Sequence, residues 1–284
     1  MKRILLQLDT DPIPSSFDRV VAIDAGAEEV LAYGGVTPDN VESLVHGAIF
    51  TRGPKELANT AIFIGGSDVQ AAEKVFAKVS QTFFGPMRVS VMLDPSGSST
   101  TAAAAVRLAS KHIALKENDA LVLGGTGPVG QRTAQILASQ GTRVRVASRT
   151  AQRAESTAAL IRGRVEGATV TPCEWSDDGL AAAVDSIEML FAAGAAGVSF
   201  LTADEWQSVE TLKVAIDLNA VPPVGLEGIA PTDQAVDHNG IAVYGALGVG
   251  GFKMKLHRAA IEKLFTANNL VLDTDAIYAL SGNL

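Results

Sequence analysis

Short apolar runs alternate with amphipathic stretches along the whole chain, and polar or glycine-rich turns separate them. The short runs have the length and residue types of buried strands, whereas the longer stretches repeat apolar residues at helical spacing. This regular alternation predicts an α/β fold in which helices cover both faces of parallel sheets. The predicted strands cover residues 3–8, 29–32, 48–50, 61–64, 88–93, 120–123, 142–150, 168–170, 188–194 and 213–217.

Capping residues and prolines mark the starts of the predicted helices. Ser15 and Ser16 precede the first helix, Pro38 suits the first position of the second, and Asp68 is placed to cap the third. An alanine-rich helix follows the polar residues 94–101, which we interpret as a loop that forms either a helix cap or a polar cradle for a ring. The predicted helices cover residues 17–25, 37–46, 69–81, 102–111, 129–140, 151–162, 180–184 and 252–265, with a short helix near the chain end.

The most informative stretch is the strand at 120–123 with the turn and helix that follow it. Gly125, Gly127 and Gly130 stand at G-x-G-x-x-G spacing between that strand and the helix. In a dinucleotide-binding turn, the first glycine permits the turn and the second admits the pyrophosphate, and the third allows close packing of the helix. Free amides at the helix start face the phosphates. The alternative is a glycine turn without a ligand. The predicted contacts are Gly125, Thr126, Gly127, Pro128, Val129 and Gly130.

The end of the next strand indicates which dinucleotide is bound. An NAD site places Asp or Glu there for the ribose 2′-hydroxyl, but this chain has Ser148, Arg149 and Thr150, with Arg153 a helical turn later. A guanidinium and hydroxyls suit a 2′-phosphate, so we predict NADP, with NAD as the alternative. The alternative is a solvated arginine on a surface loop. On the nicotinamide side we expect Ala193, Gly194 and Asn219 at the ends of later strands.

Composition and charge narrow the class of protein. The chain has 284 residues, 47% of them hydrophobic, and a net charge of −8 without a basic run, so we expect no nucleic-acid partner. Its single cysteine, Cys173, cannot form an internal disulfide or a zinc site. The apolar start is interrupted by Gln7 and Asp9, too early for a signal peptide, and no stretch is long enough to cross a membrane. We therefore expect a cytoplasmic protein with no membrane partner.

Few residues suggest conventional catalytic groups. The four histidines have no metal-ligand spacing, so we expect no metal, and no Ser/His/Asp or Cys/His arrangement is evident. Lys253 and His257 stand four residues apart and share a helical face after the glycine-rich residues 244–251, which we interpret as a hinge. That face is either directed at a substrate or solvated.

With these stretches assembled, the chain resembles the bacterial NADP-dependent methylene-tetrahydromethanopterin dehydrogenases. The resemblance spans nearly all residues, and the most specific stretch is Lys253-Met254-Lys255-Leu256-His257-Arg258-Ala259 with residues 245–248 before it. Two departures are Ser98-Ser99, where the family has a Ser-Asn pair, and the loop after Arg149. The other matching stretches are residues 7–11, 16–18, 36–41, 51–53, 60–66, 84–86, 94–101, 125–130 and 222–223.

The resemblance implies an oxidoreductase of one-carbon metabolism and formaldehyde oxidation. The expected reaction is hydride transfer from a methylene-tetrahydromethanopterin, the co-substrate, to NADP, giving the methenyl form, in a homo-oligomer. A Rossmann-type NADP domain (103–254) would be joined to a smaller α/β pterin domain built from both chain ends (1–102 with 255–284). Lys253 and His257 would lie near the pterin. The expected substrate-binding residues are Asp9, Asp11, Asp18, Asp94, Ser98 and Thr101.

Other functions stay open on the residues alone. A methylene-tetrahydrofolate dehydrogenase or another two-domain NADP-dependent dehydrogenase would share the glycine turn and the arginines. A shikimate-type enzyme would need a Lys/Asp pair in the first domain, for which only Lys55 and Asp94 are available. A non-catalytic NADP-sensing protein would need no room for a second ligand.

Overall fold

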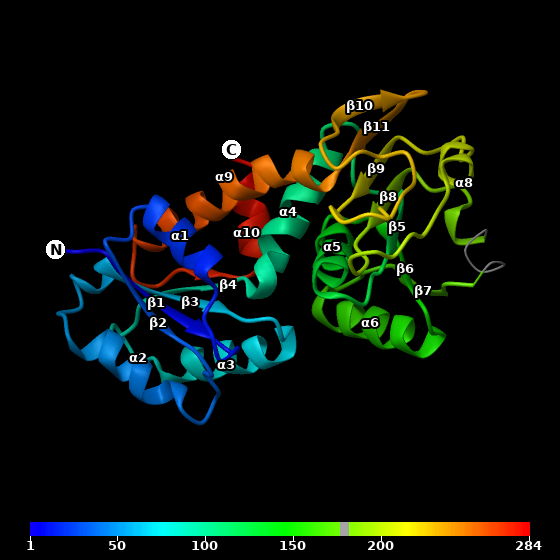
Figure 1. Ribbon diagram of the computed structural model, residues 1–284. Helices are drawn as coiled ribbons and strands as arrows, with labels where there is room; N and C mark the ends of the chain where they lie inside the picture. The colour runs from blue at the N-terminus through cyan, green and yellow to red at the C-terminus, as the bar shows by residue number, and fades with distance from the viewer. Residues whose placement is uncertain (177–181) are drawn as a thin grey trace. The chain divides into compact units, whose positions relative to one another are not determined.

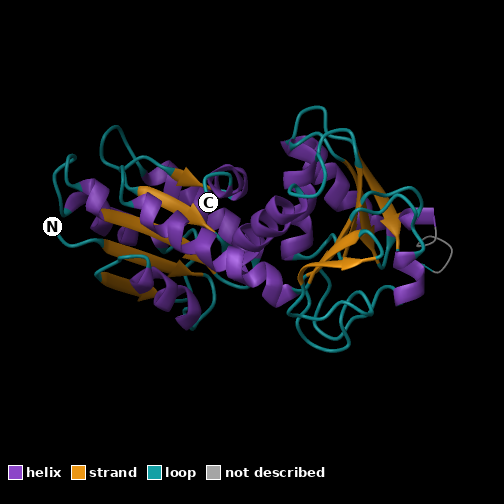
Figure 2. Ribbon diagram, turned by 90° about the horizontal axis from the view of Figure 1, so that it is seen from above, coloured by secondary structure: helices purple, strands orange, loops and turns teal. Residues whose placement is uncertain are grey.

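The computed structural model describes residues 1–176 and 182–284 (Figure 1). The chain divides into two compact units, Met1–Thr100 with Met254–Leu284, and Thr101–Lys253. Each unit holds one sheet flanked by helices, as the strands and helices in Figure 2 show. The predicted α/β class, with a Rossmann-type sheet and a smaller part drawn from both chain ends, is confirmed.

The first unit contains a five-stranded parallel sheet. In β1 and β3, the side chains of the even-numbered residues, such as Leu6, Leu8 and Ile62, enter a core beneath α2 and α3. On the opposite face, Phe63 packs against His257 of α9. The strand order is β12 (Val271–Leu272), β4 (Ser90–Leu93), β3 (Thr60–Gly65), β1 (Ile4–Asp9) and β2 (Glu29–Tyr33). The helices are α1 (Ser16–Asp24), α2 (Val41–Phe50), α3 (Val69–Thr82) and α10 (Thr274–Ser281), with α9 (Ala246–Leu264) and α4 (Ser98–Ala109) crossing the unit boundary and two 3₁₀ turns at Leu57–Asn59 and Pro95–Gly97.

The second unit contains a seven-stranded sheet that is parallel except for β10. From β5 the chain runs outward through β6 and β7 on one side and through β8 and β9 on the other. Ligands of such sheets bind beyond the carboxyl ends of the strands at this reversal. The order is β10 (Gln234–His238), β11 (Ile241–Tyr244), β9 (Val214–Asp217), β8 (Met189–Ala192), β5 (Asp119–Leu123), β6 (Arg143–Ser148) and β7 (Val170–Glu174). The helices are α5 (Pro128–Ser139), α6 (Ala151–Arg164) and α8 (Ala203–Gln207).

Two predictions in the first unit are wrong. Residues 48–50 are not a strand but the last turn of α2, because Val45, Ala48 and Ile49 continue one buried helical face. Pro38 does not begin that helix: residues 38–40 form a turn closed by a hydrogen bond from Thr37 N to Asn40 Oδ1 (2.8 Å), and α2 starts at Val41. The apolar triplet was too short for periodicity to separate a strand from a helix end.

The glycine-rich hinge is also a wrong prediction. Residues 246–251 are the first turns of α9, which runs unbroken to Leu264. Gly245 and Gly248 are needed for close packing: a Cβ atom on Gly245 would lie 2.0 Å from Ala230 O, and one on Gly248 would lie 1.9 Å from Asp233 O. These glycines therefore admit a neighbouring backbone instead of supplying a flexible joint.

Smaller differences concern strand and helix limits. Helix α4 begins at Ser98 rather than at residue 102, so half of the predicted polar loop is helical. β7 covers Val170–Glu174 instead of residues 168–170, and the sequence analysis missed β10, β11 and β12. Part of the helix predicted at 180–184 lies outside the described residues. None of the helices that the structure describes is long and apolar enough to cross a membrane.

Candidate functional site

The turn after β5 is shaped by four glycines, one more than the spacing rule identified. Gly124 adopts φ +66°, and a Cβ atom there would lie 2.8 Å from the Ala193 carbonyl. The left-handed residue of the turn is therefore Gly124, and the role predicted for Gly125 is corrected. Gly125 is required by packing, because its Cβ would lie 2.7 Å from Val146 Cγ1. A Cβ on Gly130 would lie 2.5 Å from Gly124 O, so this glycine brings α5 against the turn.

The start of α5 has the features of an anion site. Gly127 is its N-cap residue and Pro128 occupies the first turn, and no described side chain caps this end. The first amides of a helix carry partial positive charge and point out of its N-terminus. A pyrophosphate would fill this cradle, whereas a side chain larger than hydrogen at Gly127 would approach Gly124 O to 3.3 Å. The donor set and the space therefore fit a dinucleotide.

A pocket of about 460 Å³ opens beside this turn. Seven of the residues predicted to bind the cofactor line it: Thr126, Gly127, Ser148, Arg149, Arg153, Ala193 and Gly194. The sequence analysis missed the other lining residues, which are Gly124, Ala147, Trp175, Ala195, Val198 and Phe200. Among the predicted residues, Gly125, Pro128, Val129, Gly130, Thr150 and Asn219 are not part of the lining.

Two arginines line this pocket, Arg149 directly after β6 and Arg153 in the first turn of α6. Ser148 is buried, and its Oγ lies 3.3 Å from Thr126 Oγ1. Thr150 caps α6 by accepting a hydrogen bond from Arg153 N (3.4 Å), which orients the first turn of that helix. Within the described part of the chain, the guanidinium groups of Arg149 and Arg153 form no ion pair or hydrogen bond. The pocket thus has an uncompensated positive side that suits a dianion.

Asn219 orders the loop after β9. Its Oδ1 accepts from Val221 N (3.0 Å), and its Nδ2 donates to Pro223 O (3.1 Å). The buried Asp217 carboxylate accepts from Asn219 N and Leu226 N, both at 2.9 Å. Burial raises the pKa of Asp217, while the backbone N–H donors act in the opposite direction. The contacts of Asn219 are therefore with its own loop.

In the first unit, the predicted acidic residues gather at the carboxyl ends of β1 and β3. Asp9 is buried and accepts from Asp11 N (2.9 Å) and Ser15 N (3.0 Å). Asp11 accepts from the hydroxyl of Ser67 (2.8 Å). A Cβ on Gly65 would lie 3.4 Å from Asp9 Oδ2 and 3.8 Å from Asp18 Oδ2, so these two carboxylates face the same strand end.

Asp94 is used as a helix cap. Its carboxylate accepts from Ser99 N (2.8 Å), Thr100 N (3.1 Å) and the Thr100 hydroxyl (2.7 Å). Ser98 donates from its hydroxyl to Pro95 O (2.7 Å), and its side chain is buried. Thr101 is half-buried in α4. Of the two interpretations of residues 94–101, the contacts of Asp94 and Ser98 support the cap.

Lys253 and His257 lie one turn apart on α9, as their spacing predicted. Lys253 is only 9% exposed and His257 is fully buried. The His257 ring stacks on Phe63, with ring centroids 5.8 Å apart, and lies 6.4 Å from Phe17. This helical face is therefore not solvated. Among the residues that the structure describes, no group of three His, Cys, Asp or Glu side chains could hold a metal ion.

Fold and pocket together define a protein with a dinucleotide-binding Rossmann-type unit. The ligand-free 5-ketofructose reductase of Gluconobacter sp. strain CHM43 shares this fold (TM-score 0.55, 14% identity, covering 100% of this chain and 99% of that chain). Residues 16–96 match the model for the N-terminal part of methylene-tetrahydromethanopterin dehydrogenase.

Two proteins of Methylorubrum extorquens are similar over almost the whole chain. The bifunctional protein MdtA is 46% identical over 283 residues, covering 99% of this chain and 98% of that protein. The NAD(P)-dependent methylenetetrahydromethanopterin dehydrogenase is 33% identical over 280 residues, covering 94% and 93%. The chain belongs to the methylene-tetrahydromethanopterin dehydrogenase family, which confirms the resemblance.

Proposed function

We propose that this protein is an NADP-dependent methylene-tetrahydromethanopterin dehydrogenase, an oxidoreductase of one-carbon metabolism. It transfers a hydride between methylene-tetrahydromethanopterin and NADP, and the oxidised product is methenyl-tetrahydromethanopterin. The observation that carries the proposal is the 33% identity, over 94% of the chain, to a protein named for this activity. The glycine turn and the pocket beside it supply a matching dinucleotide site.

The cofactor site uses three parts of the second unit. The N-terminus of α5 would hold the pyrophosphate, and Arg149 and Arg153 would hold the ribose 2′-phosphate. Ala193 and Gly194, predicted for the nicotinamide side, both line the pocket. The lack of an acidic residue after β6 favours NADP, although the name of the Methylorubrum dehydrogenase covers NAD as well. We propose NADP as the preferred cofactor, with NAD also accepted.

The reaction needs alignment more than acid–base chemistry. NADP, when bound, supplies the hydride acceptor at C4 of its nicotinamide ring. In the substrate, the carbon–hydrogen bond of the methylene bridge breaks as a lone pair of the adjacent nitrogen forms the conjugated methenyl cation. No oxygen–hydrogen bond has to break, so the chain needs no general base. Its residues must bring two flat rings together and exclude water.

We assign the pterin to a domain of residues 1–102 with 255–284, and NADP to a domain of residues 103–254. Lys253 would position the pterin, with His257 beside it, and would not carry a proton. A positive charge next to the methenyl cation is unfavourable unless a carboxylate or the pterin carbonyl offsets it. The predicted pterin-binding residues are Asp9, Asp11, Asp18, Asp94, Ser98 and Thr101.

The test is an absorbance assay of the purified protein with each cofactor and each methylene-pterin. We expect reduction of NADP that depends on methylene-tetrahydromethanopterin and is faster than reduction of NAD. If the protein oxidises methylene-tetrahydrofolate but not methylene-tetrahydromethanopterin, the proposed substrate is wrong and the folate is the substrate. Tight NADP binding without turnover of either pterin would overturn the proposed enzymatic activity and favour an NADP-sensing protein.

We also propose that the protein acts as a cytoplasmic homo-oligomer without a nucleic-acid or membrane partner. The net charge of −8 and the single cysteine support this setting. Light scattering at micromolar concentration tests the assembly, and the mass of a single 29.4 kDa chain would exclude it. Fractionation of cells with an antibody against the protein tests the location.

A further inference from the structure

Two aromatic side chains form one wall of the pocket beside the glycine turn. Trp175 lies directly after β7, and Phe200 lies in the segment that follows β8. Their ring centroids are 4.7 Å apart with the planes tilted by 47°. Both rings are half-buried, and both line the pocket that also contains Arg149 and Arg153. The pocket therefore combines an aromatic wall with a cationic group.

The backbone of Trp175 is anchored to the end of β6, and the backbone of Phe200 to the loop after β9. Trp175 N donates to Ser148 O (2.7 Å), so the indole follows the residue that precedes Arg149. Phe200 N donates to Gly225 O (2.8 Å). The Phe200 ring lies over Gly194, where a Cβ atom would come within 2.4 Å of two ring carbons. Gly194 is thus required by the aromatic wall as well as being open to the pocket.

The chemistry of this pocket identifies one part of the ligand. A flat heteroaromatic base gains from lying against an aromatic ring, and a phosphate gains from two guanidinium groups. Adenosine 2′-phosphate carries both groups on one ribose, whereas a nicotinamide or a pterin carries no phosphate next to its ring. The pairing of aromatic and cationic walls therefore fits the adenosine half of NADP.

We propose that Trp175, supported by Phe200, is the adenine-binding platform of the cofactor site, and this rests on the proposed NADP dependence. Trp175 then contributes affinity that is common to every adenine nucleotide, whereas Arg149 contributes only where a 2′-phosphate is present. The indole and the guanidinium act on different parts of one ligand. Substitution of Trp175 and substitution of Arg149 must consequently change the nucleotide affinities in different ways.

The test measures binding of adenosine 2′,5′-bisphosphate and of adenosine 5′-monophosphate by calorimetry. Trp175→Leu is expected to weaken both nucleotides about tenfold or more, and by the same factor, because the lost stacking involves the shared base. Trp175→Phe retains a ring and should stay within about threefold of the wild type. Arg149→Asp should weaken the bisphosphate strongly and the monophosphate little.

Tryptophan fluorescence gives a second measurement that does not depend on activity. The chain has two tryptophans, and Trp206 is fully buried with its Nε1 donating to Glu227 O (2.9 Å). Quenching by adenosine 2′,5′-bisphosphate should therefore come from Trp175 and disappear in Trp175→Phe. This measurement also decides the matter if Trp175→Leu fails to fold.

The outcomes separate the platform from the proposed function. Unchanged nucleotide affinity in a folded Trp175→Leu variant, with or without a lower melting temperature, overturns the platform and leaves the dehydrogenase standing. Unequal loss for the two nucleotides also overturns it, because the indole would then be reading the phosphate. A wild-type protein that binds neither NADP nor the bisphosphate overturns both proposals.

Discussion

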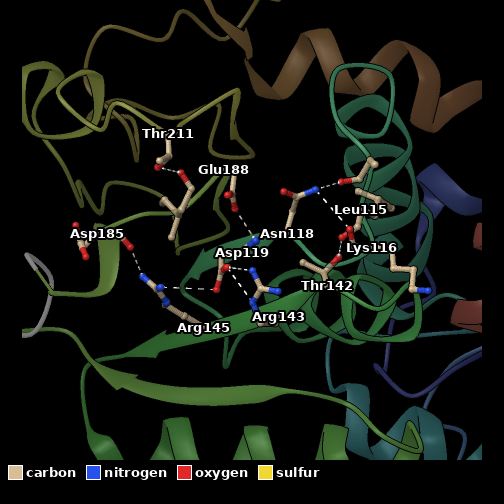
Figure 3. A network of polar contacts seen from close by, with 12 residues as sticks. Leu115, Lys116, Asn118, Asp119, Thr142, Arg143, Arg145, Asp185, Glu188 and Thr211 are labelled. Atoms are coloured by element: carbon tan, nitrogen blue, oxygen red, sulfur yellow. Dashed lines mark hydrogen bonds and ion pairs between the residues drawn. The ribbon is translucent and has the colours of Figure 1, made fainter.

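The two ends of the seven-stranded sheet use the same residue type in opposite ways. At the amino end, Arg143 and Arg145 at the start of β6 both pair with Asp119, as Figure 3 shows. Arg145 also donates to Asp185 O (2.5 Å). At the carboxyl end, Arg149 and Arg153 form no such pairs with any residue that the structure describes. Both ends carry two arginines, but only at the amino end are they paired with a carboxylate of the described chain.

The surroundings of the amino end explain why its charges are structural. Asp119 N donates to Glu188 Oε2 (2.6 Å), and Thr211 and Thr142 donate their hydroxyls to Ile187 O and Leu115 O (Figure 3). These contacts close the loops that enter β5, β6 and β8. The hydrogen bond to Asp119 raises the pKa of the Arg143 guanidinium further. A cation that the chain has already paired is a poor ligand for an incoming phosphate, so the location of the site follows from which arginines lack partners.

The largest expected effect concerns the glycine that brings α5 against the turn. Gly130→Ala should lower the free energy of unfolding by about 3 kcal/mol, because the new methyl meets backbone atoms that cannot move aside. NADP binding should be lost with the turn. Chemical denaturation and calorimetry measure both quantities.

Gly163→Ala is the matched control for that change. Gly163 lies in α6 with no atom within 4 Å of the added Cβ, so the variant should be more stable by about 0.5–1 kcal/mol. A Gly130→Ala protein as stable as this control would show that the close approach at the turn is not required.

The second expected effect tests the carboxyl-end arginines directly. Arg149→Asp should weaken NADP binding by about 1.5–3 kcal/mol through loss of charge-assisted hydrogen bonds, while NAD is affected far less. Titration of both cofactors provides the measurement. Equal loss for NADP and NAD would mean that Arg149 does not bind the 2′-phosphate.

The third prediction asks whether α9 acts independently of the dinucleotide site. Lys253→Ala should reduce turnover or pterin affinity about tenfold, with NADP affinity changed by less than about twofold. Lys255→Ala is the control, because Lys255 is exposed and donates to Leu284 O (2.8 Å). Full activity in Lys253→Ala would remove this lysine from the proposed pterin site.

The smallest effect is expected at the amino end. Arg143→Gln should change NADP affinity by less than about twofold and should lower the melting temperature slightly, since Arg143 is half exposed and exposed ion pairs contribute little. That difference should shrink as salt is raised. A strong loss of NADP affinity in Arg143→Gln would erase the contrast between the two ends of the sheet.

Local sequence signals determined the elements that lie next to the cofactor pocket. The apolar run of β5, the glycine spacing and the start of α5 are contiguous, so the turn could be predicted, although the left-handed glycine, Gly124, was not identified. The absence of an acidic residue after β6 is an equally local signal. It pointed to Arg149 and Arg153, and both line this pocket. Capping by Asp68 was predictable because the amides that donate to its carboxylate, those of Gln70 and Ala71, follow directly in the sequence.

Only the tertiary structure decided the features that depend on contacts between residues distant in sequence. Gly248 could be a hinge or a packing glycine until the Asp233 backbone was known to lie against it. Trp175 enters the pocket because β7 pairs with β6, and Phe200 reaches it by packing on Gly194. Neither contact produces a periodic pattern in the sequence. Spacing along the chain records which residues share a strand or a helix face, whereas the contacts between elements depend on how the backbone folds back on itself.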